Sequence, residues 1–311
     1  MEGMVVTDGP AGNEALACKR ACAQGDLEQS DRRRSSLVVI PTSLVVIPTY
    51  NEVQNLSPLV EHVLEQEGFD VLVIDDSSPD GTGDEADGLA RRFPGRVSVL
   101  HRAAKLGLGS AITTGLHHAL RRGYAYAFHM DADLSHDPAV LPEMRRALEC
   151  ADIVVGSRYV AGAATVCRAR HRELLSRLAS VYAGAVLGLP LSDPTGGYRG
   201  YRRQVLEALD LDQVASRGYA VQIELNHRCH QAGFRFEELP IAFHEREWGR
   251  SKMSLGIVFE ALFVVAALRL KATTPNAARE PEGLQRYNAF AAGQERQGRS
   301  IRTPQQKERS R

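Results

Sequence analysis

Two carboxylates, Asp131 and Asp133, follow a run of residues that is typical of a buried strand, 124–130. Alternate side chains of an extended chain point the same way, so both carboxylates can face one point in space. Hard oxygen ligands suit Mg²⁺ or Mn²⁺, which also takes waters and substrate phosphate oxygens. The pair therefore predicts a metal-assisted phosphate or diphosphate site. The simpler alternative is that Asp133 caps a helix beginning near Pro138 and that Asp131 is a solvated turn residue.

Two more acidic turns follow predicted strands, one at Glu52 and one at Asp75 and Asp76. The carboxyl ends of parallel strands lie at one edge of a sheet, where open α/β folds bind their ligands. Asp76 has the position after the second strand at which nucleotide sites bind ribose or base. The alternative for this pair is an ordinary turn, punctuated by Asp80-Gly81. Three acidic turns at one edge indicate a nucleotide site more strongly than any one motif.

Cationic side chains can stabilise the charge that develops on a diphosphate leaving group. The candidates are Arg158, Arg246 and Lys252, although Arg158 fits a surface salt bridge equally well. The segment Lys105-Leu-Gly-Leu-Gly109 precedes a predicted helix, whose N-terminal N–H groups could hold phosphate, but it lacks the pattern of a Walker loop. No Ser/His/Asp or Cys/His set is apparent. The histidines near these motifs are interpreted as satisfied or exposed, and none is assigned as a base.

The elements that would position these residues alternate between strand and helix. Apolar runs of β-forming residues predict strands, and apolar residues at helical spacing predict the helices between them. Strands are predicted at 44–47, 71–74, 97–100, 124–130 and 153–155, and helices at 53–67, 83–93, 108–121 and 138–149. This alternation predicts an α/β fold with a parallel sheet that is covered by helices on both faces.

The second half of the chain is less regular. A basic stretch, 168–177, leads into a helix that ends near Gly188, and turn residues from Asp193 precede aromatic strand residues. Later segments are predicted as a helix at 219–231, a strand at 235–243 and an apolar helix within 254–270. The length of this last helix suits packing better than a membrane crossing.

The composition fits a soluble protein with one large domain or two smaller ones, since 43% of the 311 residues are hydrophobic and 24% are charged. Lysine plus arginine equals aspartate plus glutamate at 38 each, so overall charge does not indicate a nucleic-acid partner. Five scattered cysteines without zinc-site spacing indicate reduced thiols in a cytoplasmic protein. Neither a signal peptide nor an apolar run of spanning length is expected.

Both ends of the chain are predicted to be disordered, because they are rich in polar and charged residues. The predicted organisation is an N-terminal extension over 1–43, a folded domain over 44–270 and a tail over 271–311. The segment SLVVIPT occurs twice in succession, as Ser36–Thr42 and Ser43–Thr49. The second copy is expected to be the first strand, because it runs directly into the acidic turn and a helix. The first copy is then an extra edge strand or a duplication artefact.

The ordered set of motifs resembles the dolichol- and polyprenol-phosphate mannosyltransferases, which are family 2 inverting glycosyltransferases. The resemblance covers residues 44–270, and it is specific because many short motifs occur in the same order. These motifs are Ile47-Pro-Thr-Tyr-Asn-Glu52, Val73-Ile-Asp-Asp-Ser-Ser-Pro-Asp-Gly-Thr82, Lys105-Leu-Gly-Leu-Gly109, Met130-Asp-Ala-Asp-Leu-Ser-His-Asp-Pro138, Gly156-Ser-Arg-Tyr159, Asp193-Pro-Thr-Gly-Gly-Tyr-Arg199, Gln222-Ile-Glu224 and 245–253.

The resemblance implies a Rossmann-like GT-A fold, with a mostly parallel central sheet flanked by helices, and transfer of mannose from GDP-mannose to a polyprenyl monophosphate with inversion. It also implies site residues, motif by motif. The nucleotide-sugar site would contain Pro48, Tyr50, Glu52, Ile74, Asp76, Asp131, Ala132, Asp133, Arg158, Arg246 and Lys252. Of these, Asp131, Asp133 and Arg158 would be catalytic; Asp131, Asp133 and Ser135 would hold Mg²⁺ or Mn²⁺; and Arg172 and Ser176 would bind the lipid phosphate.

Such a reaction needs no side-chain base. A lipid phosphate is already anionic near neutral pH, because the second pKa of a phosphate monoester is about 6. Catalysis would rest on positioning the phosphate for backside attack at the sugar C1 and on metal-assisted departure of GDP. The chain departs from the family pattern at Tyr198, where members often have Phe, and at 160–163, which is less rich in proline and glycine than usual.

No C-terminal membrane domain is apparent, although some relatives carry one. The resemblance therefore implies peripheral contact with the cytoplasmic face of the membrane, through 168–177 and the helix from Ser254. It leaves room for a separate membrane-anchoring protein or an acceptor mannosyltransferase as a partner. Two alternatives stay open: another donor such as UDP-glucose with the same acceptor, and a non-catalytic sugar-nucleotide-binding subunit. An NAD-type dehydrogenase is excluded, because its Gly-x-Gly-x-x-Gly is absent after the first strand.

Overall fold

A computed structural model describes residues 42–166, 170–216, 218–244 and 262–270, all within the unit Pro41–Arg311. The predicted tail and nearly all of the predicted extension lie outside the described residues, as do Arg246 and Lys252. The second copy of the repeated segment forms the first strand, as predicted, and this strand begins at Ser43, one residue before the predicted domain start.

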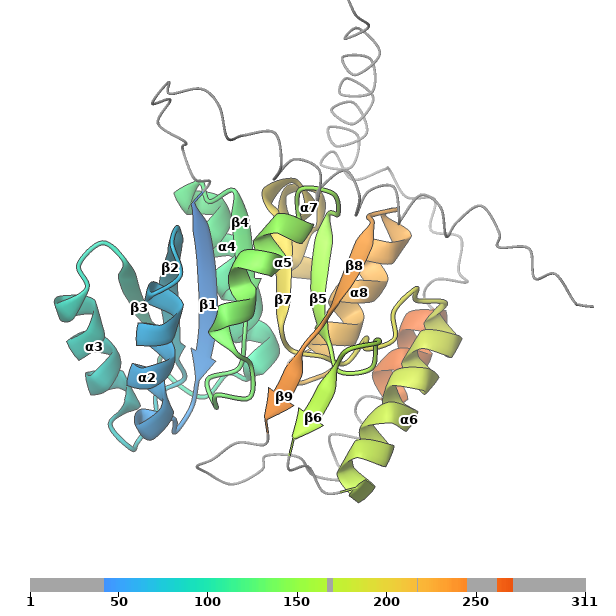
Figure 1. The fold of residues 1–311 in the computed structure, drawn as a ribbon, viewed down its shortest axis with the longest axis horizontal. Coiled ribbons are helices and arrows are strands. Elements are labelled where there is room, and N and C mark those ends of the chain that lie inside the picture. The colour runs from blue at the N-terminus through green and yellow to red at the C-terminus, as the bar shows by residue number, and fades with distance from the viewer. Residues whose placement is uncertain (1–41, 167–169, 217, 245–261, 271–311) are drawn as a thin grey trace, which may run out of the picture. The chain divides into compact units, whose positions relative to one another are not determined.

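The core of the fold is a seven-stranded sheet with the order β3-β2-β1-β4-β7-β5-β8 (Figure 1). Its strands are β1 (Ser43–Thr49), β2 (Phe69–Asp75), β3 (Val97–His101), β4 (Tyr126–His129), β5 (Ile153–Ser157), β7 (Arg199–Arg202) and β8 (Phe236–Pro240). The predicted sheet is confirmed, with one exception to its parallel order: β7 runs antiparallel to both β4 and β5. The ends of β1, β2 and β4 therefore share one edge, as the acidic turns require.

A second, two-stranded sheet pairs β6 (Ala164–Val166) with β9 (Ala242–His244) in parallel. The prediction of one strand over 235–243 is wrong, because the chain changes sheets at Ile241. Its N–H donates to Ser157 at the end of β5, and its carbonyl accepts from Ala164 at the start of β6. The preceding residue, Pro240, has no N–H to continue the first ladder.

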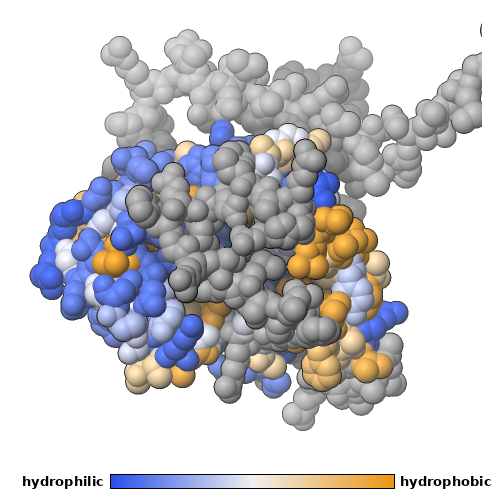
Figure 2. All heavy atoms as spheres, turned by 90° about the horizontal axis from the view of Figure 1, so that it is seen from below, coloured by the Kyte–Doolittle hydropathy of each residue, from blue (hydrophilic) through white to orange (hydrophobic). Residues whose placement is uncertain are grey.

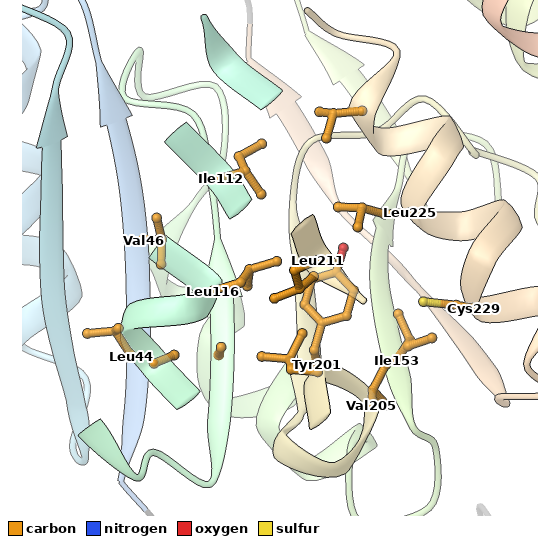
Figure 3. Close-up of a cluster of buried hydrophobic side chains, with 14 of the residues drawn as sticks. Leu44, Val46, Ile112, Leu116, Ile153, Tyr201, Val205, Leu211, Leu225 and Cys229 are labelled. Carbon is orange, nitrogen blue, oxygen red and sulfur yellow. The ribbon is translucent and has the colours of Figure 1, made fainter. Parts of the chain in front are cut away.

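Helices cover both faces of the central sheet. One face packs against α2 (Val53–Leu64), α3 (Thr82–Arg92) and α5 (Leu141–Ala147), the other against α4 (Leu108–Arg122), α7 (Arg203–Ala208) and α8 (Val221–Gln231). Figure 3 shows the hydrophobic cluster on the face covered by α4, α7 and α8, where side chains of these helices pack against those of the strands. Two short 3₁₀ segments, Pro138–Val140 and Leu211–Gln213, complete this set, and α5 is shorter than the predicted helix over 138–149.

The position of α4 over β1 depends on one glycine. A Cβ atom added at Gly115 would collide with the side chain of Val46. The absence of a side chain at this position lets the helix approach the strand closely, which outweighs the poor helix propensity of glycine. The N-terminus of α4 is thereby held beside the ends of β1 and β2.

Helix α6 (Arg170–Leu187) lies apart from the central sheet and packs with α8 and the helical segment 262–270 around Ala183, Leu187 and Val265. On its other side three apolar residues are exposed, namely Leu174 (60%), Leu178 (58%) and Val181 (67%). Apolar side chains also gather on this side of the molecule in Figure 2. Of the helices in the described ranges, none combines the length and apolar character needed to cross a membrane.

Candidate functional site

The three acidic turns share an unusual backbone conformation. Three non-glycine residues have φ in the left-handed region: Asn51 (58°), Ser77 (57°) and Leu134 (60°). Each lies in a turn that follows a parallel strand, at the ends of β1, β2 and β4 respectively. This conformation costs about 1–3 kcal/mol per residue and persists where the surroundings enforce it. The shared strain indicates that these turns are built to aim particular groups at the sheet edge.

The turn after β4 holds the predicted metal ligands. Asp133 is nearly buried, and its Oδ1 accepts hydrogen bonds from the Ser135 N–H at 3.2 Å and from the Ser135 hydroxyl. The alternative in which Asp133 caps the next helix is wrong. That role belongs to Asp137, whose side chain accepts from the Ala139 N–H at 2.9 Å. The carboxylate of Asp133 is therefore held in the turn and not used by the helix.

His136 holds the backbone of the other aspartate in this turn. The Asp131 N–H donates to the His136 Nδ1 at 3.2 Å, and the buried ring stacks on Tyr198 with a centroid distance of 5.0 Å. Burial lowers the pKa of His136, although the charges of Asp131 and Asp133 act in the opposite direction. Burial thus favours the neutral ring, the form whose Nδ1 can accept from the Asp131 N–H. Sequence reasoning missed this role, because nothing in the motif shows which way the histidine turns.

The donor set of this turn fits a hard divalent cation. Two carboxylates and a hydroxyl are the oxygen ligands that Mg²⁺ or Mn²⁺ takes, with further positions for water and phosphate oxygens. Within the part of the chain that the structure describes, three or more His, Cys, Asp or Glu side chains do not form a metal-binding cluster. The assignment of Asp131, Asp133 and Ser135 as metal ligands stays a prediction.

The turn after β1 is tied to the turn after β2. Glu52 is buried, its Oε2 accepts from the Asn55 side chain at 2.9 Å, and its N–H donates to Thr82 Oγ1 at 2.9 Å. Asp75 accepts from both the N–H and the hydroxyl of Ser78. Asp75 therefore fits the alternative of an ordinary turn, whereas Asp76 does not.

Asp76 links β2 to the segment before α4. Its buried carboxylate pairs with the guanidinium of Arg102 and accepts from the Gly107 N–H at 3.0 Å. Arg102 also donates to the Gly107 carbonyl at 3.0 Å and to the Ser110 hydroxyl at 2.5 Å. The Gly107 N–H is thus used within the protein and is not free for a phosphate. Arg102 was missed from the sequence, because a lone arginine after a strand carries no signal of its partner.

Lys105 forms a cation–π contact with Tyr50. Its Nζ lies 3.8 Å from the centroid of the Tyr50 ring, which is a cation–π distance. Two other predicted nucleotide contacts, Ile74 and Ala132, have side chains buried in the core. Their contact with a nucleotide stays a prediction that only backbone atoms could fulfil. Pro48 is half-buried in β1, close to the same edge.

Arg158 forms a fork with Asp193. Its Nε and Nη2 donate to the two Asp193 oxygens at 2.6 and 2.7 Å, and the two side chains are only 9% and 0% exposed. The alternative of a surface salt bridge is wrong, because the pair is buried. Burial alone would raise the pKa of Asp193, but the hydrogen bonds and charge of Arg158 outweigh it and lower that pKa. The sequence identified the motif that contains Asp193, but it did not predict that Asp193 pairs with Arg158.

The loop 193–197 connects this ion pair to both sides of the site. Thr195 accepts from Arg158 at 2.9 Å and hydrogen-bonds the Ser180 hydroxyl of α6 at 3.0 Å. A Cβ atom added at Gly197 would lie 3.1 Å from the Asp131 Oδ2. The loop therefore spans from α6 to the metal turn, and its glycine permits the close approach.

A buried arginine side chain supports the loop from behind. Arg199 is fully buried and donates to the carbonyls of Pro194 and Gly196 at 2.9 and 2.8 Å. Glu224 of α8 accepts from the Ser216 N–H at 2.8 Å and pairs with Arg228. Glu224 thus holds the segment before α8, and no contact of it with the acidic turns is seen among the described residues.

Of the predicted lipid-phosphate residues, Ser176 lies beside the ion pair. It is 8% exposed, and its Oγ accepts from the Tyr159 hydroxyl at 2.8 Å. Arg172 lies one turn earlier in α6, but its side chain is outside the described residues. The structure therefore brings together Asp131, Asp133, Arg158 and Ser176, whereas Arg246 and Lys252 fall where it describes nothing.

Comparisons with known proteins identify the family to which the chain belongs. The family model described as Glycosyl transferase family 2 matches residues 44–210. A polyprenol monophosphomannose synthase of Mycolicibacterium smegmatis is 47% identical over 228 residues, which cover 72% of this chain and 85% of that protein. An undecaprenyl-phosphate mannosyltransferase of Micrococcus luteus is 47% identical over 231 residues, which cover 74% of this chain and 94% of that protein.

Solved structures show the same fold at low identity. A crystal structure of glucosyl-3-phosphoglycerate synthase from Mycobacterium tuberculosis, with Mn²⁺, UDP and glucosyl-3-phosphoglycerate, matches with a TM-score of 0.54 and 20% identity. The match covers 76% of this chain and 82% of that one. A crystal structure described as a mycobacterial protein has a TM-score of 0.57 at 19% identity, over 78% and 81% of the two chains. These likenesses concern the fold alone.

Proposed function

Since the chain belongs to glycosyl transferase family 2, and is thus a glycosyltransferase with the GT-A-like fold of its structural neighbours, we propose that it transfers mannose from GDP-mannose to a polyprenyl monophosphate with inversion. The observation that carries the proposal is the 47% identity to two proteins that are named for joining mannose to polyprenyl phosphates. The arrangement of Asp131 and Asp133 across one loop from Ser176 supports it, because a donor and an acceptor site must adjoin.

The donor occupies the edge formed by the three acidic turns. Tyr50, Glu52 and Asp76 surround the nucleoside end, where Arg102 and Lys105 hold the facing segment in place. Asp131 and Asp133, with Ser135, would hold Mg²⁺ or Mn²⁺. When bound, such a cation stabilises the charge that develops on the departing GDP. The glucosyl-3-phosphoglycerate synthase of similar fold was crystallised with Mn²⁺, which supports the choice of a divalent cation.

The acceptor occupies the opposite side of loop 193–197. Arg172 and Ser176 bind the lipid phosphate, and the buried pair of Arg158 with Asp193 fixes the distance between this helix and the metal turn. An anionic phosphate oxygen attacks the sugar C1, so no side chain has to remove a proton. The contribution of these residues is alignment of the phosphate with C1, which converts a bimolecular step into an effectively unimolecular one.

The exposed side of α6 rests on the lipid bilayer in this proposal. Leu174, Leu178 and Val181 are spaced along one face of the helix, and Ser176 lies in the same helix but is buried toward the site. A helix that lies in the interface inserts about 5–10 Å into the headgroup region. Its inner side then stands near the level of the lipid phosphates, where the acceptor's own phosphate lies. This contact would hold the enzyme at the cytoplasmic face of the membrane.

Vesicle flotation tests the bilayer contact. Replacing Leu174, Leu178 and Val181 with Ser should abolish co-flotation with vesicles of phosphatidylcholine and phosphatidylglycerol. Leu106, which is 52% exposed on another part of the surface, provides the matched control, and Leu106→Ser should float like the unmodified protein. Equal flotation of the triple variant would refute the contact and favour a separate anchoring protein.

A transfer assay tests the function itself. The purified protein is incubated with Mg²⁺ or Mn²⁺, polyprenyl phosphate and either radiolabelled GDP-mannose or UDP-glucose, and label is counted in the organic phase. Label from GDP-mannose alone is the expected result. Label from UDP-glucose alone would overturn the named sugar but keep the acceptor. Donor binding without any transfer would make the non-catalytic sugar-nucleotide-binding subunit the correct interpretation.

A further inference from the structure

Tyr159 lies between two guanidinium groups beside the proposed acceptor site. The Cζ atom of Arg158 is 5.1 Å from the centroid of the Tyr159 ring, and that of Arg177 is 5.0 Å from it. Both are cation–π distances, which hold a guanidinium over a ring face without neutralising its charge. The same aromatic ring thus contacts a cation from β5's end and another from α6.

The Tyr159 hydroxyl determines what the Ser176 hydroxyl can do. It donates to Ser176 Oγ at 2.8 Å, and Ser176 is only 8% exposed. A serine hydroxyl has one proton and two lone pairs. Since the tyrosine proton fills one lone pair, the serine proton is turned away from Tyr159. Ser176 is thereby prepared as a hydrogen-bond donor, which is the form that an anionic phosphate oxygen requires.

The two arginines differ in how firmly they are held. Arg158 is locked in a buried fork with Asp193, so it cannot leave to meet a substrate. Among the described residues, the ion-pair partner of Arg177 is Glu173 of the preceding turn, at 3.0 Å, and the Arg177 side chain is 57% exposed. Exposed pairs of this kind contribute little stability. An anion arriving at Ser176 can therefore draw Arg177 away from Glu173 while the ring of Tyr159 keeps it close.

We propose that Tyr159 is a positioning residue for the acceptor phosphate, which orients the Ser176 hydroxyl as a donor and holds Arg177 as a movable cation beside it. The inference rests on the proposed function, because it takes Ser176 to contact the lipid phosphate. It adds two residues, Tyr159 and Arg177, to those that the family resemblance assigns to the acceptor.

A double-mutant cycle tests this role. The variants are Tyr159→Phe, Ser176→Ala and the combination, each assayed for the KM of polyprenyl phosphate and of the sugar-nucleotide donor. Tyr159→Phe keeps the ring and should raise the acceptor KM about 5- to 10-fold, as expected for the loss of one hydrogen bond between neutral groups. The donor KM should stay unchanged. Because Tyr159 acts through Ser176, the combination should be no worse than Ser176→Ala alone.

The outcomes separate this inference from the proposed function. Multiplying effects in the combination, or a donor KM that rises as much as the acceptor KM, would overturn the role of Tyr159 while leaving the acceptor site intact. A normal acceptor KM in Ser176→Ala would overturn the acceptor assignment and this inference together.

A second variant addresses Arg177 independently. Arg177→Gln should raise the acceptor KM about 3-fold or more, a typical loss for one exposed charge near an anion. The matched control is Arg203→Gln, which removes an exposed arginine with the same spacing to its glutamate, Glu207, at 2.6 Å on α7. Equal kinetics of the two arginine variants would overturn the role of Arg177.

Discussion

The donor side and the acceptor side of the site are built in different ways. On the donor side, the carboxylates of Glu52, Asp75 and Asp133 accept from side chains only two or three residues away. On the acceptor side, the paired groups are 35, 17 and 15 residues apart, in Arg158–Asp193, Tyr159–Ser176 and Ser180–Thr195. These three carboxylates of the donor side are thus held within their own turns, whereas the acceptor side is assembled by the tertiary fold. Asp76 is the exception on the donor side, because it pairs with Arg102, 26 residues away.

Because of this difference, substitutions on the two sides should differ in how they affect turnover and stability. A carboxylate in a local turn can be removed while the surrounding strands stay paired, so its loss should affect turnover first. A buried ion pair such as Arg158–Asp193 joins distant segments, and removing one partner leaves an uncompensated buried charge. Substitutions on the acceptor side should therefore affect folding as well as activity.

The largest expected effect lies on the donor side. Asp133→Ala should lower turnover by about 10³-fold, since removing a group that stabilises transition-state charge costs about 10²- to 10³-fold. The thermal midpoint should change little, because β4, which precedes this turn, stays paired with β1 and β7 when the carboxylate is removed. Initial rates in the transfer assay and a melting curve check both points. Asp212→Ala, at an exposed aspartate on the surface, is the control. Near-normal turnover would refute the metal assignment.

On the acceptor side, Asp193→Asn should lower the free energy of unfolding by about 3–5 kcal/mol, the usual cost of breaking a buried pair from one side. The guanidinium of Arg158 would stay buried beside a neutral amide that cannot balance its charge. Urea unfolding of the two proteins measures the difference. A loss below about 1 kcal/mol, as for an exposed pair, would show that the fork does not join the two segments.

The contact between the two sides can be changed by one methyl group. Gly197→Ala would place Cβ 3.1 Å from the Asp131 Oδ2, so the carboxylate must move by a few tenths of an ångström. Since a 1 Å displacement can cost about 10²-fold, a loss of about 10-fold in turnover is expected. Gly88→Ala is the matched control, because its Cβ would meet its nearest neighbour only at 3.9 Å. Unchanged turnover in Gly197→Ala would show that the loop does not constrain Asp131.

The smallest effect concerns acid pH. The pKa of Asp193 is lowered in the folded protein, so its stabilisation is present above the unfolded pKa, about 3.9, and is lost as pH falls through the folded value. The free energy of unfolding should therefore fall less steeply below about pH 5 in Asp193→Asn than in the unmodified protein. Unfolding curves at pH 7, 5 and 4 measure both slopes. Parallel slopes would contradict the assigned ion pair.

The same contrast explains what the sequence could predict. The strand and helix order from β1 to β5 was predicted because hydrophobic periodicity is a local property. The acidic turns were predicted because each directly follows its strand. Placing Asp131 and Asp133 at this edge required only the direction of β4 and no other knowledge of the fold.

Features that depend on distant partners were not predicted. Strand β7 lies between β4 and β5 and runs antiparallel to both. The pattern of its own residues does not indicate this direction. The change of sheet at Ile241 depends on hydrogen bonds to Ser157 and Ala164, both far away in sequence. The partners of Asp76 and Arg158 are likewise set by tertiary contacts. Conversely, Ile74 belongs to a nucleotide motif, yet its side chain is buried in the core.

The central claim is that donor binding belongs to the acidic turns and acceptor binding to the side of α6. Calorimetry of GDP binding in the presence and absence of Mn²⁺, with Asp133→Ala and Ser176→Ala, tests it most directly. Asp133→Ala is expected to lose the Mn²⁺-dependent part of the GDP affinity, whereas Ser176→Ala is expected to bind GDP like the unmodified protein. Equal weakening of GDP binding in both variants would contradict the division of the site.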